Sequence, residues 1–194
     1  MADENEQTHI MLNNVRASFA HLFRPPVIDG ETGKCGSQLM LDPEEHADEL
    51  EELNEEIRRV GRANFERRLP AEKICLRAGE DKGREEYDGW MILSANCKEG
   101  SRPVVVDAVD PEKIIDDESR NPIYSGCRVN AKVRIWPQKN QWGKRINCSL
   151  IAIQFARDDE PLDSGTVTEG DAVKGFTATK KGKKSGGGGG GEDW

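Results

Sequence analysis

The chain has 194 residues, of which 35% are hydrophobic and 33% are charged, and its formal net charge is -8. This length suits one domain with a tail and is too short for two well-buried domains. No segment approaches the roughly 20 apolar residues of a membrane-spanning helix. The acidic start MADENEQTHI also lacks the pattern of a signal peptide, so we expect a cytoplasmic protein without membrane contact.

The N-terminal half of the chain predicts two strands, a connection between them and one helix. Residues 9–19 read as a strand, residues 23–33 are rich in Pro and Gly and predict a loop or hairpin connection, and residues 34–41 alternate like a half-buried strand. The sequence Asp42-Pro43-Glu44-Glu45 predicts a helix start. Apolar residues at helical spacing carry this helix to about residue 64, and its acidic outer face is expected to be solvated.

The C-terminal half predicts a long hairpin. Short strands are expected at residues 74–76, 90–95 and 104–106, the last at a sheet edge or strand start because a Pro precedes it. A clear strand over residues 126–136, a turn over 137–143 and a returning strand over 145–155 form the hairpin. Apolar periodicity ends after residue 157, which predicts disorder. Many short strands with one early helix indicate a small antiparallel barrel or sandwich.

The negative net charge conceals a basic segment. Residues 42–57 hold nine acids and no Lys or Arg, whereas residues 119–157 hold eight Lys or Arg and no Asp or Glu. Basic side chains neutralise phosphates in any sequence context, and exposed aromatic rings stack on unpaired bases. The basic segment therefore predicts binding of a single strand, and the alternative is a solvated strand whose Trp side chains pack on the helix. The candidate contacts are Arg128, Lys132, Arg134, Trp136, Lys139, Trp142, Lys144 and Arg145.

The end of the chain is a second candidate site. Six glycines precede Glu192-Asp193-Trp194, so two carboxylates and an indole lie on a flexible tether. Such a tip could dock in a basic, apolar-lined pocket of a partner protein or fold back onto the chain's own basic face. A structureless terminus of chance composition is the alternative.

Neither a metal site nor an enzyme active site is indicated. The five cysteines include no C-x-x-C pair and the three histidines are scattered, so we expect reduced, mostly buried thiols and no cofactor. Residues 79–89 are dotted with glycine but acidic, which is the wrong sign for holding phosphates. Asp116-Asp117-Glu118 could hold Mg²⁺ for nuclease chemistry, although acids in a polar loop are more simply solvated.

Three parts of the sequence stand out together: LNNVRASF at residues 12–19 followed by LF, the blocks over residues 83–96 and 102–107, and YSGC at residues 124–127. They resemble a bacteriophage family of OB-fold single-stranded-DNA-binding proteins. The resemblance covers about residues 10–162 and implies a mainly β fold, a five-stranded barrel with one inserted helix. It also implies a DNA-binding groove, homodimers, and an acidic C-terminal tip that recruits replication or recombination proteins.

Carried over by position, the resemblance assigns the strand that enters the groove to Tyr124, Arg128, Lys132, Arg134 and Trp136, and its flanking loop to Trp142, Lys144 and Arg145. The tip departs from the family, whose tips typically carry more acids and end in Phe. We divide the chain into a flexible acidic N-terminus (1–8), an OB-fold domain (9–160) and a Lys/Gly-rich tail (161–194). The hypothesis is a non-enzymatic protein that coats single-stranded DNA. The alternative is an acidic inhibitor of a host DNA-binding factor.

Overall fold

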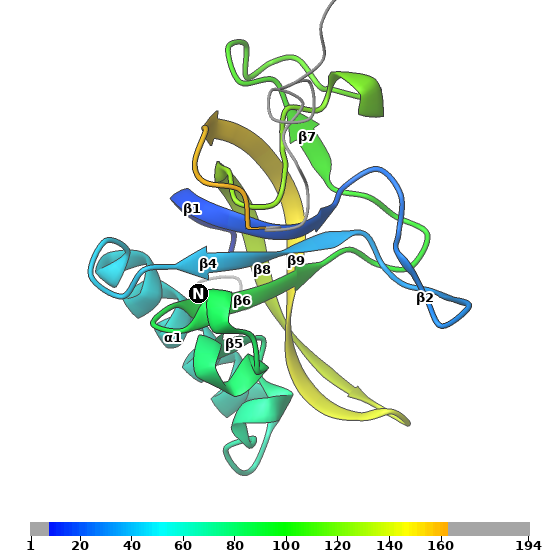
Figure 1. Cartoon of the computed structure of the whole chain (residues 1–194). Helices are drawn as coiled ribbons and strands as arrows, with labels where there is room; N and C mark the ends of the chain where they lie inside the picture. The colour runs from blue at the N-terminus through cyan, green and yellow to red at the C-terminus, as the bar shows by residue number, and fades with distance from the viewer. Residues whose placement is uncertain (1–7, 163–194) are drawn as a thin grey trace, which may run out of the picture. The chain divides into compact units, whose positions relative to one another are not determined.

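Five strands close into a barrel in the computed structural model, which describes residues 8–162 (Figure 1). They are β1 (Ile10–His21), β4 (Gly36–Leu41), β6 (Met91–Asn96), β8 (Arg128–Asn140) and β9 (Gly143–Arg157). Antiparallel pairs join β6 to β4, β4 to β1, β1 to β8 and β8 to β9. A parallel pairing of Ala95 with Cys148 links β6 to β9 and closes the ring. The expected mainly β barrel with one inserted helix is therefore confirmed.

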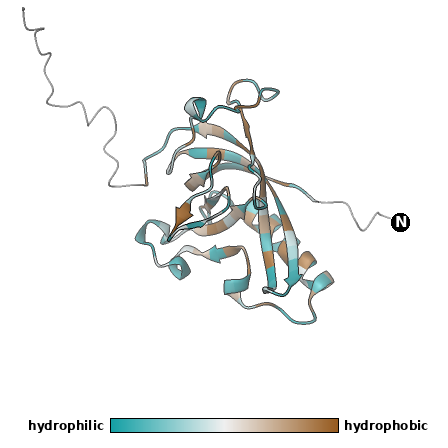
Figure 2. Ribbon diagram, turned by 90° about the vertical axis from the view of Figure 1, so that its right-hand side faces the viewer, coloured by the Kyte–Doolittle hydropathy of each residue, from teal (hydrophilic) through white to brown (hydrophobic). Residues whose placement is uncertain are grey.

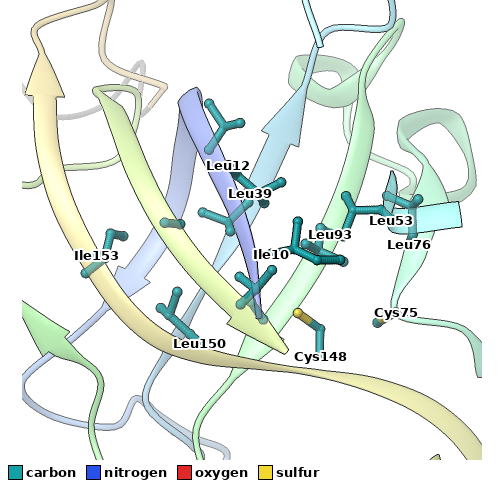
Figure 3. Close-up of a cluster of buried hydrophobic side chains, with 14 of the residues drawn as sticks. Ile10, Leu12, Leu39, Leu53, Cys75, Leu76, Leu93, Cys148, Leu150 and Ile153 are labelled. Atoms are coloured by element: carbon teal, nitrogen blue, oxygen red, sulfur yellow. The ribbon is translucent and has the colours of Figure 1, made fainter. Parts of the chain in front are cut away.

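The barrel encloses an apolar core to which all five strands contribute buried residues. Hydrophobic and hydrophilic residues are interspersed along the strands (Figure 2), and in β8 they alternate, as in a strand with one buried face. In β8 the buried positions are Val129, Ala131, Val133 and Ile135, as the sequence predicts. Leu39, Leu93, Leu150 and other apolar side chains from the other barrel strands belong to the same buried cluster (Figure 3). All five cysteines are buried free thiols, as expected, and act as small apolar side chains in or near this core.

The helix α1 (Ala47–Asn64) lies against the barrel through its apolar residues and leaves its acidic face to solvent. It begins five residues later than the expected cap, Asp42. The Asp42 carboxylate accepts the backbone N–H groups of Glu44 and Glu45, at 2.8 and 3.0 Å, and so closes a separate turn. The buried His46 then accepts the Asp42 N–H through Nδ1, which fixes this turn ahead of the helix.

Two short hairpin strands extend the connection between β1 and β4. β2 (Val27–Ile28) pairs with β3 (Glu31–Thr32) through Asp29 and Gly30, whose φ angles of 52° and 81° match a type I′ turn.

The remaining elements are short. β5 (Leu76–Ala78) pairs with β6, and β7 (Val104–Val106) pairs with β9 at a sheet edge, as expected. Single 3₁₀ turns occupy Ala71–Lys73, Gly79–Lys82, Glu85–Tyr87 and Glu118–Arg120.

The β8–β9 hairpin is longer than the sequence predicts and extends beyond the barrel (Figure 1). Its turn is only Gln141-Trp142 instead of residues 137–143. Pro137 lies inside β8, opposite Ile146, where β8 has lost its pairing with β1. A proline is tolerated there because β8 is an edge strand in that stretch.

Candidate nucleic-acid interface

The outer surface of strands β4 and β6 is hollowed between the β2–β3 hairpin and the segment that precedes β6. We call this depression, of about 350 Å³, the β4–β6 hollow. Its lining residues are Phe19, His21, Pro26, Ile28, Lys34, Gly36, Ser37, Gln38, Lys82, Arg84, Tyr87 and Asn96. None of these is Asp or Glu, and three are Lys or Arg. A concave site that combines positive charge with apolar and aromatic groups suits an anionic ligand with flat rings.

Phe19 reaches the hollow because β1 contains a bulge. The pairing between β1 and β4 shifts between Ser18 and His21, and Phe19 adopts a left-handed φ of 48°. This conformation costs a bulky residue roughly 1–2 kcal/mol. The ring is 38% exposed, and the Arg84 guanidinium lies 4.4 Å from its centre. Bulges near binding sites commonly re-aim a side chain, and here the strained backbone presents an aromatic face.

The segment over residues 79–89 forms the second wall of the hollow. Tyr87 anchors it, because its ring is buried and its hydroxyl lies 2.9 Å from the Ser18 Oγ on β1. The segment is acidic overall, as its sequence shows, but two of its basic side chains, Lys82 and Arg84, line the hollow. Arg84 also pairs with Glu86 at 3.1 Å, so its charge is partly balanced within the segment. The expectation that this segment has the wrong sign for holding phosphates stays a prediction, which phosphate binding at Lys82 would contradict.

Three of the expected contacts lie on the outer face of β8. Lys132 is exposed, and Arg134 and Trp136 are half-buried. Strand register connects this face to the hollow: Trp136 lies opposite Asn147 of β9, and Asn147 adjoins the Ala95–Cys148 pair that joins β9 to β6. The outer surface of the barrel is therefore continuous from the hollow to Trp136.

The end of the hairpin carries the other expected contacts, but on two faces. Lys139 and Lys144 lie directly opposite each other, whereas Arg145 is opposite Gln138 on the other face of the ribbon. Like charges in cross-strand pairs repel, so the lysine pair would be stabilised by a bound anion. Trp142, in the turn, is 77% exposed.

Arg128 and Tyr124, which the resemblance assigns to the groove, form hydrogen bonds within the protein. The Arg128 guanidinium is almost buried and contacts Asp159 at 2.7 Å and Glu45 at 3.1 Å. Burial disfavours its charge, but the hydrogen bonds that it donates to these carboxylates outweigh burial and raise the pKa of Arg128. The Tyr124 hydroxyl donates to Asp158 or to the Asp159 carbonyl. Both side chains thus hold the segment that follows β9.

Replacing Arg128 by Leu is expected to lower the free energy of unfolding by about 2 kcal/mol at neutral pH, since two carboxylates lose their partner. The hydrogen bond from Arg128 is the main cause that lowers the pKa of Asp159 below its ordinary 3.8. That stabilisation is present above the ordinary pKa and disappears as the pH falls through the lowered one. The variant Asp159→Asn tests this pH dependence, because it removes the carboxylate. Its loss of unfolding free energy relative to the original protein, measured by urea unfolding, should become smaller below about pH 4.

Arg68→Leu is the matched control for this charge, because Arg68 is exposed and has no ion pair among residues 8–162. It should change the unfolding free energy by less than about 0.5 kcal/mol. Equal stabilities of Arg128→Leu and Arg68→Leu would contradict the anchoring role.

The residues that sequence reasoning missed are Phe19, Lys34, Lys82 and Arg84. Phe19 stands in the LNNVRASF motif, but nothing in its neighbours signals a bulge. Lys82 and Arg84 stand among acids, which hid them in a charge count. The only usable signal was the strand pattern of residues 34–41 and 90–95, since adjacent strands of a small barrel present an outer face that loops can border.

Comparison with known proteins decides the family. Residues 8–184 match the family described as Enterobacter phage Enc34, ssDNA-binding protein. The chain belongs to this family. A relative, protein p50 of Acyrthosiphon pisum secondary endosymbiont phage 1, is 33% identical over 168 residues, which cover 81% of this chain and 88% of the relative.

Solved structures of the Enc34 single-stranded DNA-binding protein are similar to this barrel. The bacteriophage Enc34 protein in complex with ssDNA is 28% identical, with a TM-score of 0.69 over 79% of this chain and 89% of that one. A second structure of the Enc34 protein gives 28% identity and a TM-score of 0.70, over 85% of this chain and 89% of that one. Bacteriophage T7 gp2.5, at 16% identity and a TM-score of 0.54, covers 89% of this chain and 100% of its own, and shows the fold alone. The barrel is thus the OB-like fold of phage ssDNA-binding proteins.

In this member of the Enc34 family, the acidic triplet offers no metal cage. Asp117 accepts the Ser119 backbone N–H and hydroxyl, and Glu118 pairs with Arg24. Within residues 8–162 there is no cluster of three or more His, Cys, Asp or Glu able to hold a metal ion. No helix in the same range combines the length and apolar character needed to cross a bilayer. The expected partner-binding tip, Glu192-Asp193-Trp194, lies outside the described residues.

Proposed function

We propose that this protein binds single-stranded DNA without sequence preference, and that the β4–β6 hollow is the centre of the binding surface. The observation that carries the proposal is the hollow itself, where Phe19 and the basic side chains Lys34, Lys82 and Arg84 meet without a carboxylate in the lining. The strand 2–3 face of an OB-fold barrel, with the loops beside it, is the usual place for an oligonucleotide, and here that face is β4–β6. The family and the similar Enc34 protein complexed with ssDNA support the same substrate.

The β8–β9 hairpin extends this surface. In an OB fold the loop between strands 4 and 5 borders the groove, and here that loop carries Trp142 with Lys139, Lys144 and Arg145 close by. Trp136 and Arg134 lie between the hairpin end and the hollow on the same outer surface. A track of basic and aromatic groups contacts the backbone and the base faces of a single strand and needs no particular base sequence.

Such binding would protect and keep open the single strands that arise during phage DNA replication and recombination, in the cytoplasm of the host. The protein would act by occupancy, without catalysis. We also propose that Glu192-Asp193-Trp194 recruits replication or recombination proteins, because an acidic, aromatic peptide on a glycine tether can search for a basic pocket without releasing the DNA.

Titration with a poly-dT oligonucleotide, followed by tryptophan fluorescence, tests the proposed function. We expect strong quenching and an affinity that falls as salt rises from about 50 to 200 mM, because each neutralised phosphate releases counterions. A duplex oligonucleotide should quench much less, since its bases are already stacked. Absence of binding to poly-dT at low salt would contradict the proposal and favour an acidic protein that inhibits a partner.

Trp142→Ala is expected to reduce both the quenching and the affinity, the latter about fivefold. This is the low end of the roughly 1–3 kcal/mol that one stacked base contributes, because Trp142 is 77% exposed and held only by the turn. Trp142→Phe keeps a stacking face and should retain most of the affinity. If both variants bind poly-dT like the original protein, the hairpin end lies outside the DNA track.

A further inference from the structure

Two basic side chains beside the hollow have an unusual environment. Arg77 on β5 lies opposite Ile92 of β6, and Lys82 in the following turn contacts Ser94, two residues further along β6. The Lys82 ammonium donates to the Ser94 Oγ at 2.9 Å and lies 3.4 Å from the Gln38 Oε1. Ser94 in turn donates to the same Gln38 oxygen at 2.7 Å. Among the described residues, the charged Lys82 ammonium therefore donates hydrogen bonds only to neutral oxygen atoms.

Neither charge is balanced by a carboxylate. Within residues 8–162, no Asp or Glu forms an ion pair with Arg77 or Lys82. Arg77 donates to the Asp81 carbonyl at 3.0 Å, and its Nε is buried without a hydrogen-bond partner. Burial, and then the neighbouring Arg77, lowers the pKa of Lys82. A half-buried pair of like charges is unfavourable by itself, so the fold keeps a charge excess that an anion would relieve.

The donors that remain free suit a phosphate. A lysine ammonium has three N–H groups and a guanidinium has five. Among the described residues Lys82 makes two hydrogen bonds and keeps one donor for a ligand, whereas Arg77 makes one and keeps most of its donors. Lys82 also lines the hollow in which Phe19 offers a stacking face. A nucleotide bound there could place its base near Phe19 and an adjoining phosphate near Lys82.

We propose that Lys82 and Arg77 form a binding site for one phosphodiester group of the single-stranded DNA backbone. The inference rests on the proposed function, since it assigns a ligand group to one edge of the same surface. It also assigns a function to the segment between α1 and β6. In this segment, β5 and the turn after it place both charges on the outer face of the barrel.

The salt dependence of poly-dT binding tests this site through Lys82→Gln. Loss of one phosphate contact should make the slope of log K against log salt shallower by about 0.7, the single-strand value for one contact. We expect the affinity at moderate salt to fall about threefold to tenfold. Lys82→Arg should restore the slope, because a guanidinium also binds phosphate. The unfolding midpoint of Lys82→Gln should not fall, since the change removes a poorly balanced charge.

Lys113→Gln is the matched control, because Lys113 is an exposed lysine in the loop after β7 and pairs with Asp110. It removes the same charge from the protein and should leave the slope unchanged. Equal slopes for Lys82→Gln and the original protein, with tight poly-dT binding in both, would overturn the phosphate site and leave the proposed function standing. Failure of the original protein to bind poly-dT would instead remove the proposed function.

A second readout uses the ammonium of Lys82 in the unaltered protein. Adding poly-dT should raise its pKa, measured by NMR of the side-chain carbon next to the ammonium, because a nearby phosphate favours the charged form. The neighbouring groups that titrate or carry charge are Arg77 and the buried thiol of Cys75. A rise with inorganic phosphate but none with poly-dT would overturn the proposal in favour of a site for small anions.

Discussion

Phe19→Asn is expected to weaken poly-dT binding about 30-fold while leaving the unfolding free energy within about 0.5 kcal/mol of the original. One base stacked on an aromatic ring contributes roughly 1–3 kcal/mol, and Phe19 is the ring that the bulge of β1 places in the hollow. Asn accepts a left-handed φ far better than Phe does, so relief of strain at 48° offsets the lost packing of a partly exposed ring. Fluorescence titration and urea unfolding measure the two quantities separately.

Two comparisons keep this result specific. Phe19→Trp retains a stacking face and should bind poly-dT nearly as well as the original. Arg84, which covers the Phe19 ring in the free protein, should lose its contact in Phe19→Asn without a measurable change in stability, because both groups are solvent-exposed. A Phe19→Asn protein that binds poly-dT normally would move the base contacts out of the hollow. Equal losses of stability and affinity would make Phe19 a structural residue.

Local alternation made the barrel strands predictable. In β8 every second residue from Val129 to Ile135 is apolar and buried, and the residues between them face outward. Turn chemistry was equally local, since Asp29-Gly30 needs no distant partner to adopt the two positive φ angles of its hairpin. The start of α1 was misplaced because Asp42, a good cap in any sequence, caps a separate turn. The buried His46 fixes this turn by accepting the Asp42 N–H, and its other ring nitrogen lies 3.3 Å from the Asn14 carbonyl of β1, a contact that the sequence does not reveal.

The binding surface could be predicted only in part, because the hollow is assembled from segments far apart in the chain. Phe19, Lys34 and Lys82 meet only when β1, β4 and β6 are paired, and the sequence does not reveal that register. The basic hairpin was visible because its charges are neighbours in sequence. Charge density along the chain thus points to the border of the proposed binding surface and not to its proposed centre.

Arg128 shows why a positive charge and a position in a basic strand do not by themselves identify a contact with DNA. It belongs to the same basic strand as Lys132 and Arg134, yet its partners Glu45 and Asp159 are 83 and 31 residues away. Only the closed barrel brings these carboxylates to it. A basic residue in a strand is free for DNA when no acid reaches it, and that depends on tertiary structure.

Gly79→Ala is expected to destabilise the protein by about 3 kcal/mol, because no space exists for the added methyl group. A Cβ on Gly79 would lie 1.7 Å from the Tyr87 carbonyl oxygen and 3.0 Å from that of Trp90. Both neighbours are backbone atoms, and the Gly79 N–H also donates to the Trp90 carbonyl at 2.8 Å. The methyl group can be accommodated only by displacing the segment over residues 79–89, at or above the usual 1–3 kcal/mol of overpacking. Urea unfolding measures the loss.

Gly89→Ala separates this clash from ordinary backbone strain. Gly89 has a φ of 82°, but a methyl group added there would project into open space, so the change should cost only about 1 kcal/mol. If Gly79→Ala lowers the free energy of unfolding by no more than Gly89→Ala does, the backbone at Gly79 is not held tightly against the backbone of Tyr87 and Trp90.

The same variant links stability to binding. The segment that Gly79 holds against Tyr87 carries Lys82 and Arg84 into the hollow, so its displacement should also weaken poly-dT binding. At low temperature, where most Gly79→Ala molecules remain folded, we expect an affinity loss at least as large as that of Lys82→Gln. Retention of full affinity would mean that the second wall of the hollow, residues 79–89, contributes nothing to DNA binding.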